Sequence, residues 1–528
     1  MPAAFAPFRH PAFRLLWFAN LAANIGLWVQ NTGAGWMMTS LDPSPVMVSL
    51  VQAASMLPVF LLALPSGALA DIVDRRAYLI GAQAWVLTVA ALLAVLTYAG
   101  WLGPWGLLAF TFAIGIGNAL NFPAWAATTP ELVPREDLVQ AIALNGIGFN
   151  LSRAVGPAIG GFAIGLAGTE AAFALNAVCF LVLLLALLAW KREAPRSALP
   201  SEHFLGAMRA GLRFVAASPA MRAAILRACT FFFFTAAIWG LLPLVVRQGL
   251  GLGPEAFGTM LGVMGVGAVA TGFALPALRV RLPTRGGMVT VFSLVSAAAL
   301  ALLGVSGHWA PAALAMLLFG AGWIGAASTL QAAAQFATPA WVRARAIGIY
   351  QLCFFGALTV GSVLWGWAGA RFGIAPALLI AAVACAGAAL AVRGWRLDGA
   401  PAADAPSVPM PKPDAPAAEL GPLLTERSGR VLEVVRYTVD PADRSAFLAA
   451  MEEARRVRLR SGAVAWRLLE DVAHPERWIE LWAVESWAEH MREAGRLDAA
   501  DRAALARAAA FHRGDGPPEA ARYLSVRA

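Results

Sequence analysis

Long apolar runs alternate with short polar connections over the first four hundred residues of the chain. A run of about 20 apolar residues can cross the hydrocarbon core of a bilayer as a helix. The longest connection, 191–221, divides the runs six and six, so the sequence predicts two six-helix bundles, at 1–190 and 222–398, joined by a cytoplasmic linker. The pattern predicts twelve membrane helices, at 12–39, 46–70, 77–98, 104–127, 138–166, 170–190, 222–248, 255–279, 285–305, 309–335, 343–369 and 374–394.

The pattern changes after residue 398. A stretch rich in Pro and Ala at 399–424 is typical of a semi-rigid linker. After it, residues 425–528 read in the order β-α-β-β-α-β, which predicts a small ferredoxin-like α+β domain. The expected strands lie at 430–439, 464–470, 477–484 and 522–526, with helices at 443–459 and within 487–511.

Composition and charge point to a lipid environment. Charged residues make up 13% of the chain, against about 25% for a soluble domain. The net charge of +9 comes from the membrane part, because 22 of the 40 Lys and Arg but only 11 of the 31 Asp and Glu precede Gly399. The basic residues recur in alternate connections, which places both termini and the C-terminal domain in the cytoplasm. The charge therefore reflects loops facing anionic lipid, and no nucleic-acid partner is expected.

Cysteines and histidines give no sign of a cofactor. The four cysteines, at 179, 229, 353 and 385, lie far apart in apolar segments, which fits neither a disulfide framework nor a metal site. His474, His490 and His512 lack ligand spacing. We expect no metal, no cofactor and no catalytic residue.

The connection between the second and third helices reads GALADIVDRR from Gly67 to Arg76. Asp71 can accept hydrogen bonds from a helix terminus, and Arg75 and Arg76 can pair with it across the cytoplasmic face. Such a charged group would hold one conformation and separate in another. The sequence predicts a conformational latch made of Gly67, Asp71, Arg75 and Arg76.

The fifth helix combines small residues with a cation. A face of residues four apart, from Gly148 to Gly160, lets another helix approach closely in lipid. Arg153 lies near the middle of this helix, where an arginine costs about 2.5–3.5 kcal/mol on insertion scales, so it should face protein or a water-filled cavity. The candidate functional motif of this helix is Ser152, Arg153, Gly156, Pro157, Gly160 and Gly161.

These two motifs resemble those of the major facilitator superfamily. GALADIVDRR is similar to its signature loop G-x-L-A-D-R-x-G-R-[KR], with departures at Ile72 and Asp74. The run from Ser152 to Gly161 resembles the fifth-helix motif G-x-x-x-G-P-x-x-G-G of its exporters, and residues 5–395 resemble the enterobactin-exporter-like branch. The resemblance implies alternating access between two bundles. It also implies efflux by antiport with protons in a bacterial inner membrane.

Polar residues at membrane depth mark the expected substrate cavity. Neutral amides together with aromatic side chains suit an amphipathic or aromatic small molecule better than a compact ion. The candidates are Asn20, Asn24, Asn31, Asn145, Asn150, Arg153, Gln331 and Gln335. A proton relay usually needs an intramembrane carboxylate or histidine, and the sequence offers almost none, so the coupling to the proton gradient comes from the resemblance alone.

The C-terminal domain resembles the antibiotic-biosynthesis-monooxygenase-like family, on strand pattern and aromatic positions such as Trp466, Trp478 and Trp482. That resemblance implies dimerisation through the sheet. Two alternatives to a simple exporter stay open. The domain could act on the substrate as a membrane-anchored enzyme, or it could sense ligand and regulate the bundle.

Overall fold

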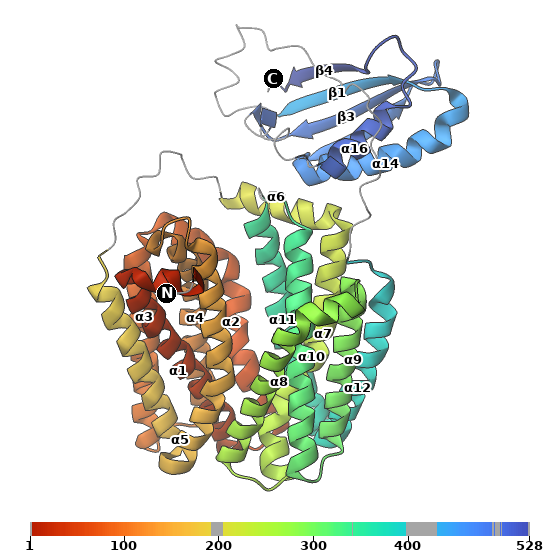
Figure 1. Ribbon diagram of the computed structural model, residues 1–528. Coiled ribbons are helices and arrows are strands. Elements are labelled where there is room, and N and C mark those ends of the chain that lie inside the picture. The colour runs from red at the N-terminus through yellow and green to blue at the C-terminus, as the bar shows by residue number, and fades with distance from the viewer. Residues whose placement is uncertain are drawn as a thin grey trace. The chain divides into compact units, whose positions relative to one another are not determined.

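The computed structural model of the protein describes residues 3–191, 204–339, 342–397, 430–487, 490–491, 497 and 499–525. These divide into two compact units (Figure 1). The first contains most of the long helices. The second contains the C-terminal sheet, the short helix α6 (Phe204–Ala217) and Ala333–Ile349.

Eleven helices in the described chain are long and apolar enough to cross a membrane. The N-terminal half has α1 (Pro11–Leu41), α2 (Pro45–Ile72), α3 (Arg75–Tyr98), α4 (Pro104–Leu132) and α5 (Leu138–Ala189). The C-terminal half has α7 (Pro219–Leu244, extended by a π-helical turn at Val245–Gly249), α8 (Pro254–Arg281), α9 (Arg285–Gly304), α10 (Trp309–Phe336), α11 (Arg343–Phe372) and α12 (Ile374–Ala391).

Helix α5 is two spans in one. Its 52 residues would extend about 78 Å, more than twice the hydrocarbon core of a bilayer. The helix breaks at Ala167 and Gly168, and Gly168 has φ of 80°, a conformation that favours glycine. The described helices therefore supply twelve spans, and the predicted fold class is confirmed.

Local sequence explains where several helices begin. Pro11, Pro45, Pro104 and Pro254 occupy the first helical position, where the missing N–H costs nothing. Asp74 caps α3 by accepting from the Ala77 N–H at 2.9 Å. Polar and Pro-bearing connections thus set the ends of spans whose interiors are mostly apolar.

The small residues of α5 allow close contact with α1. A Cβ on Gly156 would lie 2.6 Å from the Cβ of Trp28, and one on Gly160 would lie 3.1 Å from the Cα of Val29. The second span of α5 also packs on α1, where Gly33 leaves room for the ring of Phe173. Helix α1 therefore sits against both spans of α5, and its polar residues are held by a tightly packed wall.

The second unit has a four-stranded antiparallel sheet in the order β2-β3-β1-β4. The strands are β1 (Val431–Thr438), β2 (Ala465–Glu470), β3 (Arg477–Val484) and β4 (Glu519–Leu524), and α14 (Arg444–Ser461) and α16 (Ala499–Ala509) lie on one face (Figure 1). This is the predicted ferredoxin-like order. The last strand begins at 519, three residues before the predicted start.

Of the two predicted linkers, the structure describes one in part and leaves the other out. Helix α6 falls inside the predicted linker 191–221, and its Arg213 pairs with Glu485 of the sheet domain at 3.2 Å. The Pro/Ala-rich linker at 399–424 lies outside the described residues.

Candidate substrate cavity

A cavity of about 860 Å³ lies between the two halves of the helical unit. Its volume is in the range of pockets that enclose drug-sized ligands. Side chains from α1, α2, α4 and α5 form one wall, and side chains from α7, α8, α10 and α11 form the other.

The wall from the N-terminal half is rich in amides. Asn24 Nδ2 donates to the Asn20 carbonyl at 2.8 Å, and Asn145 Nδ2 donates to Thr129 Oγ1 at 3.0 Å. Most of these amides bond within their own helix or to a neighbouring helix, so they keep polar groups at membrane depth without charge. The amide residues of this wall are Asn20, Asn24, Gln30, Asn31, Gln52, Asn118, Asn121, Asn145 and Asn150.

The wall from the C-terminal half is aromatic. Trp239 packs on Trp323 with ring centroids 5.4 Å apart, and Phe232 meets Phe354 edge to face at 4.2 Å. Trp28 of the opposite wall lies 6.0 Å from Trp239. The aromatic residues of this wall are Phe232, Trp239, Phe257, Trp323, Tyr350, Phe354 and Phe355.

Arg153 is the charged residue of the cavity. It is 9% exposed, and its Nη2 donates to Asn150 Oδ1 at 2.9 Å. Among the described residues that line the cavity, Arg153 and Tyr350 are the only titratable side chains. The lining as described is thus neutral apart from one cation.

Seven of the eight predicted cavity residues line this space: Asn20, Asn24, Asn31, Asn145, Asn150, Arg153 and Gln331. Gln335, four residues beyond Gln331 on α10, is exposed and does not line it. Sequence reasoning missed Gln30 and Trp125. Gln30 neighbours Asn31 on the same polar stretch, whereas Trp125 carried no signal that separated it from an ordinary membrane tryptophan.

The two halves touch at one end of the cavity. A Cβ on Gly161 of α5 would lie 2.7 Å from the Cα of Gly258 on α8, so these helices cross almost backbone to backbone. Arg247 donates to Thr39 Oγ1 at 2.8 Å and to the Ser40 hydroxyl. These contacts lie near the α1 C-terminus and the α8 N-terminus, the end opposite the basic connections. They close that end of the cavity.

The predicted latch is described only for its arginines. Arg75 Nη1 donates to Glu131 Oε1 at 2.6 Å. Arg76 donates to the carbonyl oxygens of Leu187 and Leu188 at the end of α5. The structure describes Gly67 and Asp71 only by their place in α2, so their part in a latch stays a prediction.

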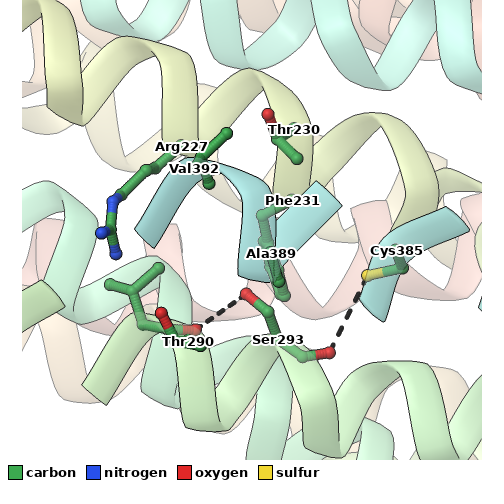
Figure 2. A pocket seen from close by; sticks show the side chains of 9 residues that line it. Arg227, Thr230, Phe231, Thr290, Ser293, Cys385, Ala389 and Val392 are labelled. Carbon is green, nitrogen blue, oxygen red and sulfur yellow. Dashed lines mark hydrogen bonds between the residues drawn. The ribbon is translucent and has the colours of Figure 1, made fainter. Parts of the chain in front are cut away.

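A second pocket in the C-terminal half is too small for a substrate, at about 10 Å³, roughly the room of one water molecule (Figure 2). Arg227 at its edge donates to three carbonyl oxygens, those of Gly286, Arg393 and Trp395, at 2.7–3.1 Å. Cys385 donates to the Ser293 carbonyl at 3.8 Å (Figure 2). This pocket is a packed junction of α7, α9 and the end of α12.

The sheet domain has a buried polar cluster on its helix-covered face. Glu480, fully buried, accepts from Tyr437 Oη at 3.0 Å, Trp466 Nε1 at 3.0 Å and Arg458 Nε at 3.3 Å. The Arg458 guanidinium lies 3.6 Å from the ring centroid of Trp482. Burial, and then the charge of Glu480, hold the pKa of Tyr437 well above its usual value. In the described residues no group of three or more His, Cys, Asp or Glu could hold a metal ion.

Comparison with known proteins places the whole chain in one family. Residues 2–528 match the family described as transmembrane secretion effector. The staphyloferrin A transporter of Staphylococcus aureus is 26% identical over 162 residues, which is 30% of this chain and 41% of that protein. The enterobactin exporter EntS of Shigella flexneri is 26% identical over 376 residues, 68% of this chain and 86% of that protein.

Solved structures agree on the helical fold. A POT family transporter in complex with a thioalcohol-conjugated peptide matches with a TM-score of 0.61 at 12% identity, over 72% of this chain and 95% of that chain. A D-xylose–proton symporter matches with a TM-score of 0.56 at 15% identity, over 72% and 97%. Such low identity carries the fold alone, so the chemistry has to be argued from the cavity.

Proposed function

The chain belongs to the transmembrane secretion effectors of the major facilitator superfamily and is a multi-pass membrane transporter, and we propose that it exports a small amphipathic or aromatic, siderophore-like compound. The observation that carries the proposal is the cavity of about 860 Å³, in which most lining amides lie on one wall and most lining aromatic rings lie on the other. Such a lining binds molecules with an apolar body and several hydrogen-bonding groups. The chain spans less than half of the staphyloferrin A transporter but 86% of the enterobactin exporter.

Alternating access is the mechanism that we propose. The halves meet through Gly161 and Gly258 at one end of the cavity, where a Cβ on either glycine would overlap the other backbone. Rocking of the halves would open this end of the cavity and close the opposite end. The substrate shifts this equilibrium only if its affinity differs between the two states. By the positive-inside rule, the closed end would face the outer side of a bacterial inner membrane, and both termini would lie in the cytoplasm.

Coupling to the proton gradient is part of the proposal, since the resemblance implies it. The described lining of the cavity has no carboxylate or histidine, so the proton carrier would lie outside it. Two acidic groups near the cytoplasmic ends are already paired: Glu131 with Arg75, and Asp137 with His10 at 2.9 Å. A change of pairing at either site would tie proton uptake to rocking of the halves.

The test is accumulation in whole cells. Cells with and without the protein would be loaded with fluorescent aromatic compounds of each charge class and with metal chelators. Lower accumulation of at least one compound, restored to the level of control cells by a protonophore, supports proton-coupled export. Unchanged accumulation across the panel, with the protein present in the membrane, would remove the proposal. Lower accumulation that a protonophore leaves intact would remove the coupling only.

A second role, pairing of two copies through the sheet domain, has its own observation. The strand face opposite α14 and α16 carries Leu469 and Tyr523, which are 47% and 48% exposed, beside Leu432 and Ile479. A half-exposed apolar face of this kind marks an interaction surface. Deleting 400–528 would give a monomer if this face pairs two copies. A change in transport after the same deletion would favour a regulatory role for the domain. Conversion of an aromatic substrate into a product by the full-length protein would favour the enzyme alternative.

A further inference from the structure

We propose that the cavity holds an anion, with the acidic group of the substrate bound to Arg153 and its aromatic body against Trp28, Trp239 and Trp323. This inference rests on the proposed export function and names the substrate class for that site. It goes beyond an amphipathic ligand, because it fixes the sign of the charge and the orientation of the molecule in the cavity.

The first observation is that Arg153 has donors to spare. A guanidinium has five N–H donors, and the described structure gives one side-chain partner, the Oδ1 of Asn150 at 2.9 Å. Asn150 is neutral, and its own Nδ2 donates back to the Gly146 carbonyl at 2.9 Å. Within the described residues no carboxylate bonds to Arg153. Burying a cation without a counter-ion is unfavourable, and a bound anion would offset that cost.

The second observation is a set of buried donors that lack acceptors. Three residues of the cavity lining have a nitrogen that is shielded from solvent and has no hydrogen-bond partner in the described structure: Gln30 Nε2, Trp125 Nε1 and Trp239 Nε1. All three atoms are N–H donors. Leaving a buried donor unpaired is unfavourable, so a ligand rich in oxygen acceptors gains where small side-chain shifts bring these donors to it. A cationic ligand would supply donors and would leave these three N–H groups unpaired.

The third observation is the separation of chemistry between the walls. Arg153 and nine of the eleven lining amides belong to the N-terminal half, the other two being Gln331 and Gln351, whereas Trp239 and Trp323 belong to the C-terminal half. Trp28 reaches across, with its ring centroid 6.0 Å from that of Trp239. Offset or edge-on contacts with these rings favour a flat aromatic body. An aromatic acid satisfies both walls at once.

Arg227 shows what a structural arginine in this bundle looks like. Its guanidinium donates to three backbone carbonyl oxygens, and the pocket beside it has room for about one water molecule. Arg153 differs on both counts, since it has one neutral partner and faces a cavity of about 860 Å³. This difference assigns Arg153 a role in binding a ligand, whereas Arg227 has a structural role.

The test compares two ligands of the same shape on the full-length protein in detergent. 2-Naphthoate is an aromatic carboxylate, and 2-naphthamide is its neutral counterpart; quenching of tryptophan fluorescence measures both affinities. We expect naphthoate to bind at least tenfold more tightly. Arg153→Gln should remove this preference, Arg153→Lys should retain part of it, and Arg371→Gln, an exposed cation outside the cavity, should retain all of it.

Equal affinity of the wild-type protein for the two ligands, or no binding of naphthoate, would overturn the inference without any variant. A preference that survives in Arg153→Gln would place the anion elsewhere and would also overturn it. If Arg153→Gln fails to fold, protection of Arg153 from phenylglyoxal by naphthoate, and not by naphthamide, decides the question in the wild-type protein. No protection would count against the site. Export of neutral or cationic compounds alone in the cell assay would leave the proposed function standing while the anion site fails.

Discussion

The cavity and the helix-covered face of the sheet domain contain the same residue types, which have different roles in the two places. Both contain a buried arginine among tryptophans. Arg458 has a buried partner, Glu480, and lies over the ring of Trp482, and Glu480 in turn accepts from two further side chains. Arg153 has one neutral partner and a large cavity beside it. A buried charge whose partners are complete stabilises a fold, and one whose partners are incomplete is available to a ligand.

Breaking the complete cluster should have the largest effect. Glu480→Gln removes the acidic partner of the buried Arg458–Glu480 pair, and removing one partner of a buried pair costs about 3–5 kcal/mol. Hydrogen exchange of the β1 and β3 amides in the full-length protein should show a loss of protection of that size. The matched change Glu476→Gln, at a more exposed position between His474 and Arg477, should cost under about 1 kcal/mol. Equal losses for the two variants would contradict a structural role for the cluster.

The two arginines of the bundle sharpen the comparison. Arg227→Gln removes donors from the carbonyl oxygens of Gly286, Arg393 and Trp395, so we expect it to destabilise the bundle by at least about 2 kcal/mol. Arg153→Gln removes an uncompensated charge and should leave the thermal midpoint in detergent unchanged or raised. A lower midpoint for Arg153→Gln than for Arg227→Gln would reverse the assignment of the two residues.

A smaller effect is expected where α5 crosses α8. A methyl group on Gly258 would lie 2.7 Å from the Gly161 Cα and from the Pro157 carbonyl oxygen, so Gly258→Ala should separate the halves at the closed end. A cysteine in place of Leu261, in a background without native cysteines, should then react several-fold faster with an impermeant maleimide added outside. Gly262→Ala is the control, because its methyl group would meet Ala158 at an ordinary 3.6 Å. No difference between the two would show that this crossing does not close the cavity.

The smallest effect is a pH dependence in the sheet domain. Burial lowers the pKa of His512, whose Nδ1 accepts from the Thr438 N–H at 2.9 Å. The unfolded chain therefore binds more protons, so this stability is present above the usual histidine pKa, about 6.5, and is lost as pH falls through it toward the folded value. The protection factor of the Thr438 amide, which corrects for the intrinsic pH dependence of exchange, should fall below that pH, and this slope should vanish in His512→Gln. A slope that persists there, or that disappears in the exposed His474→Gln control, would contradict this account.

The sequence predicts the membrane part well because its signals are local and strong. Apolar runs, prolines at helix starts and Gly168 at the break in α5 each act within a few residues, so the twelve spans follow from the chain itself. The strands of the sheet domain also follow, since alternation such as that along β3 reflects one buried face.

The cavity is predictable only in part, because it depends on pairings between distant segments. Asn20 and Arg153 stand out as polar groups at membrane depth, but Trp125 becomes part of the lining only through packing of helices. The sequence gives no signal that separates the two arginines. Arg227 donates to carbonyl oxygens of residues more than fifty positions away, whereas Arg153 has no such partners in the described structure. The same limit applies to Gln335, which shares a helix with Gln331 and lies outside the cavity lining.

The central claim is that Arg153 receives the acidic group of the transported molecule. A structure of the full-length protein with bound 2-naphthoate tests it most directly. The account predicts carboxylate oxygens within hydrogen-bond distance, about 2.7–2.9 Å, of the Arg153 guanidinium, with the ring against Trp239 and Trp323. A carboxylate bound away from Arg153, or a naphthoate molecule with its ring on the amide wall and its charge among the aromatics, would contradict it.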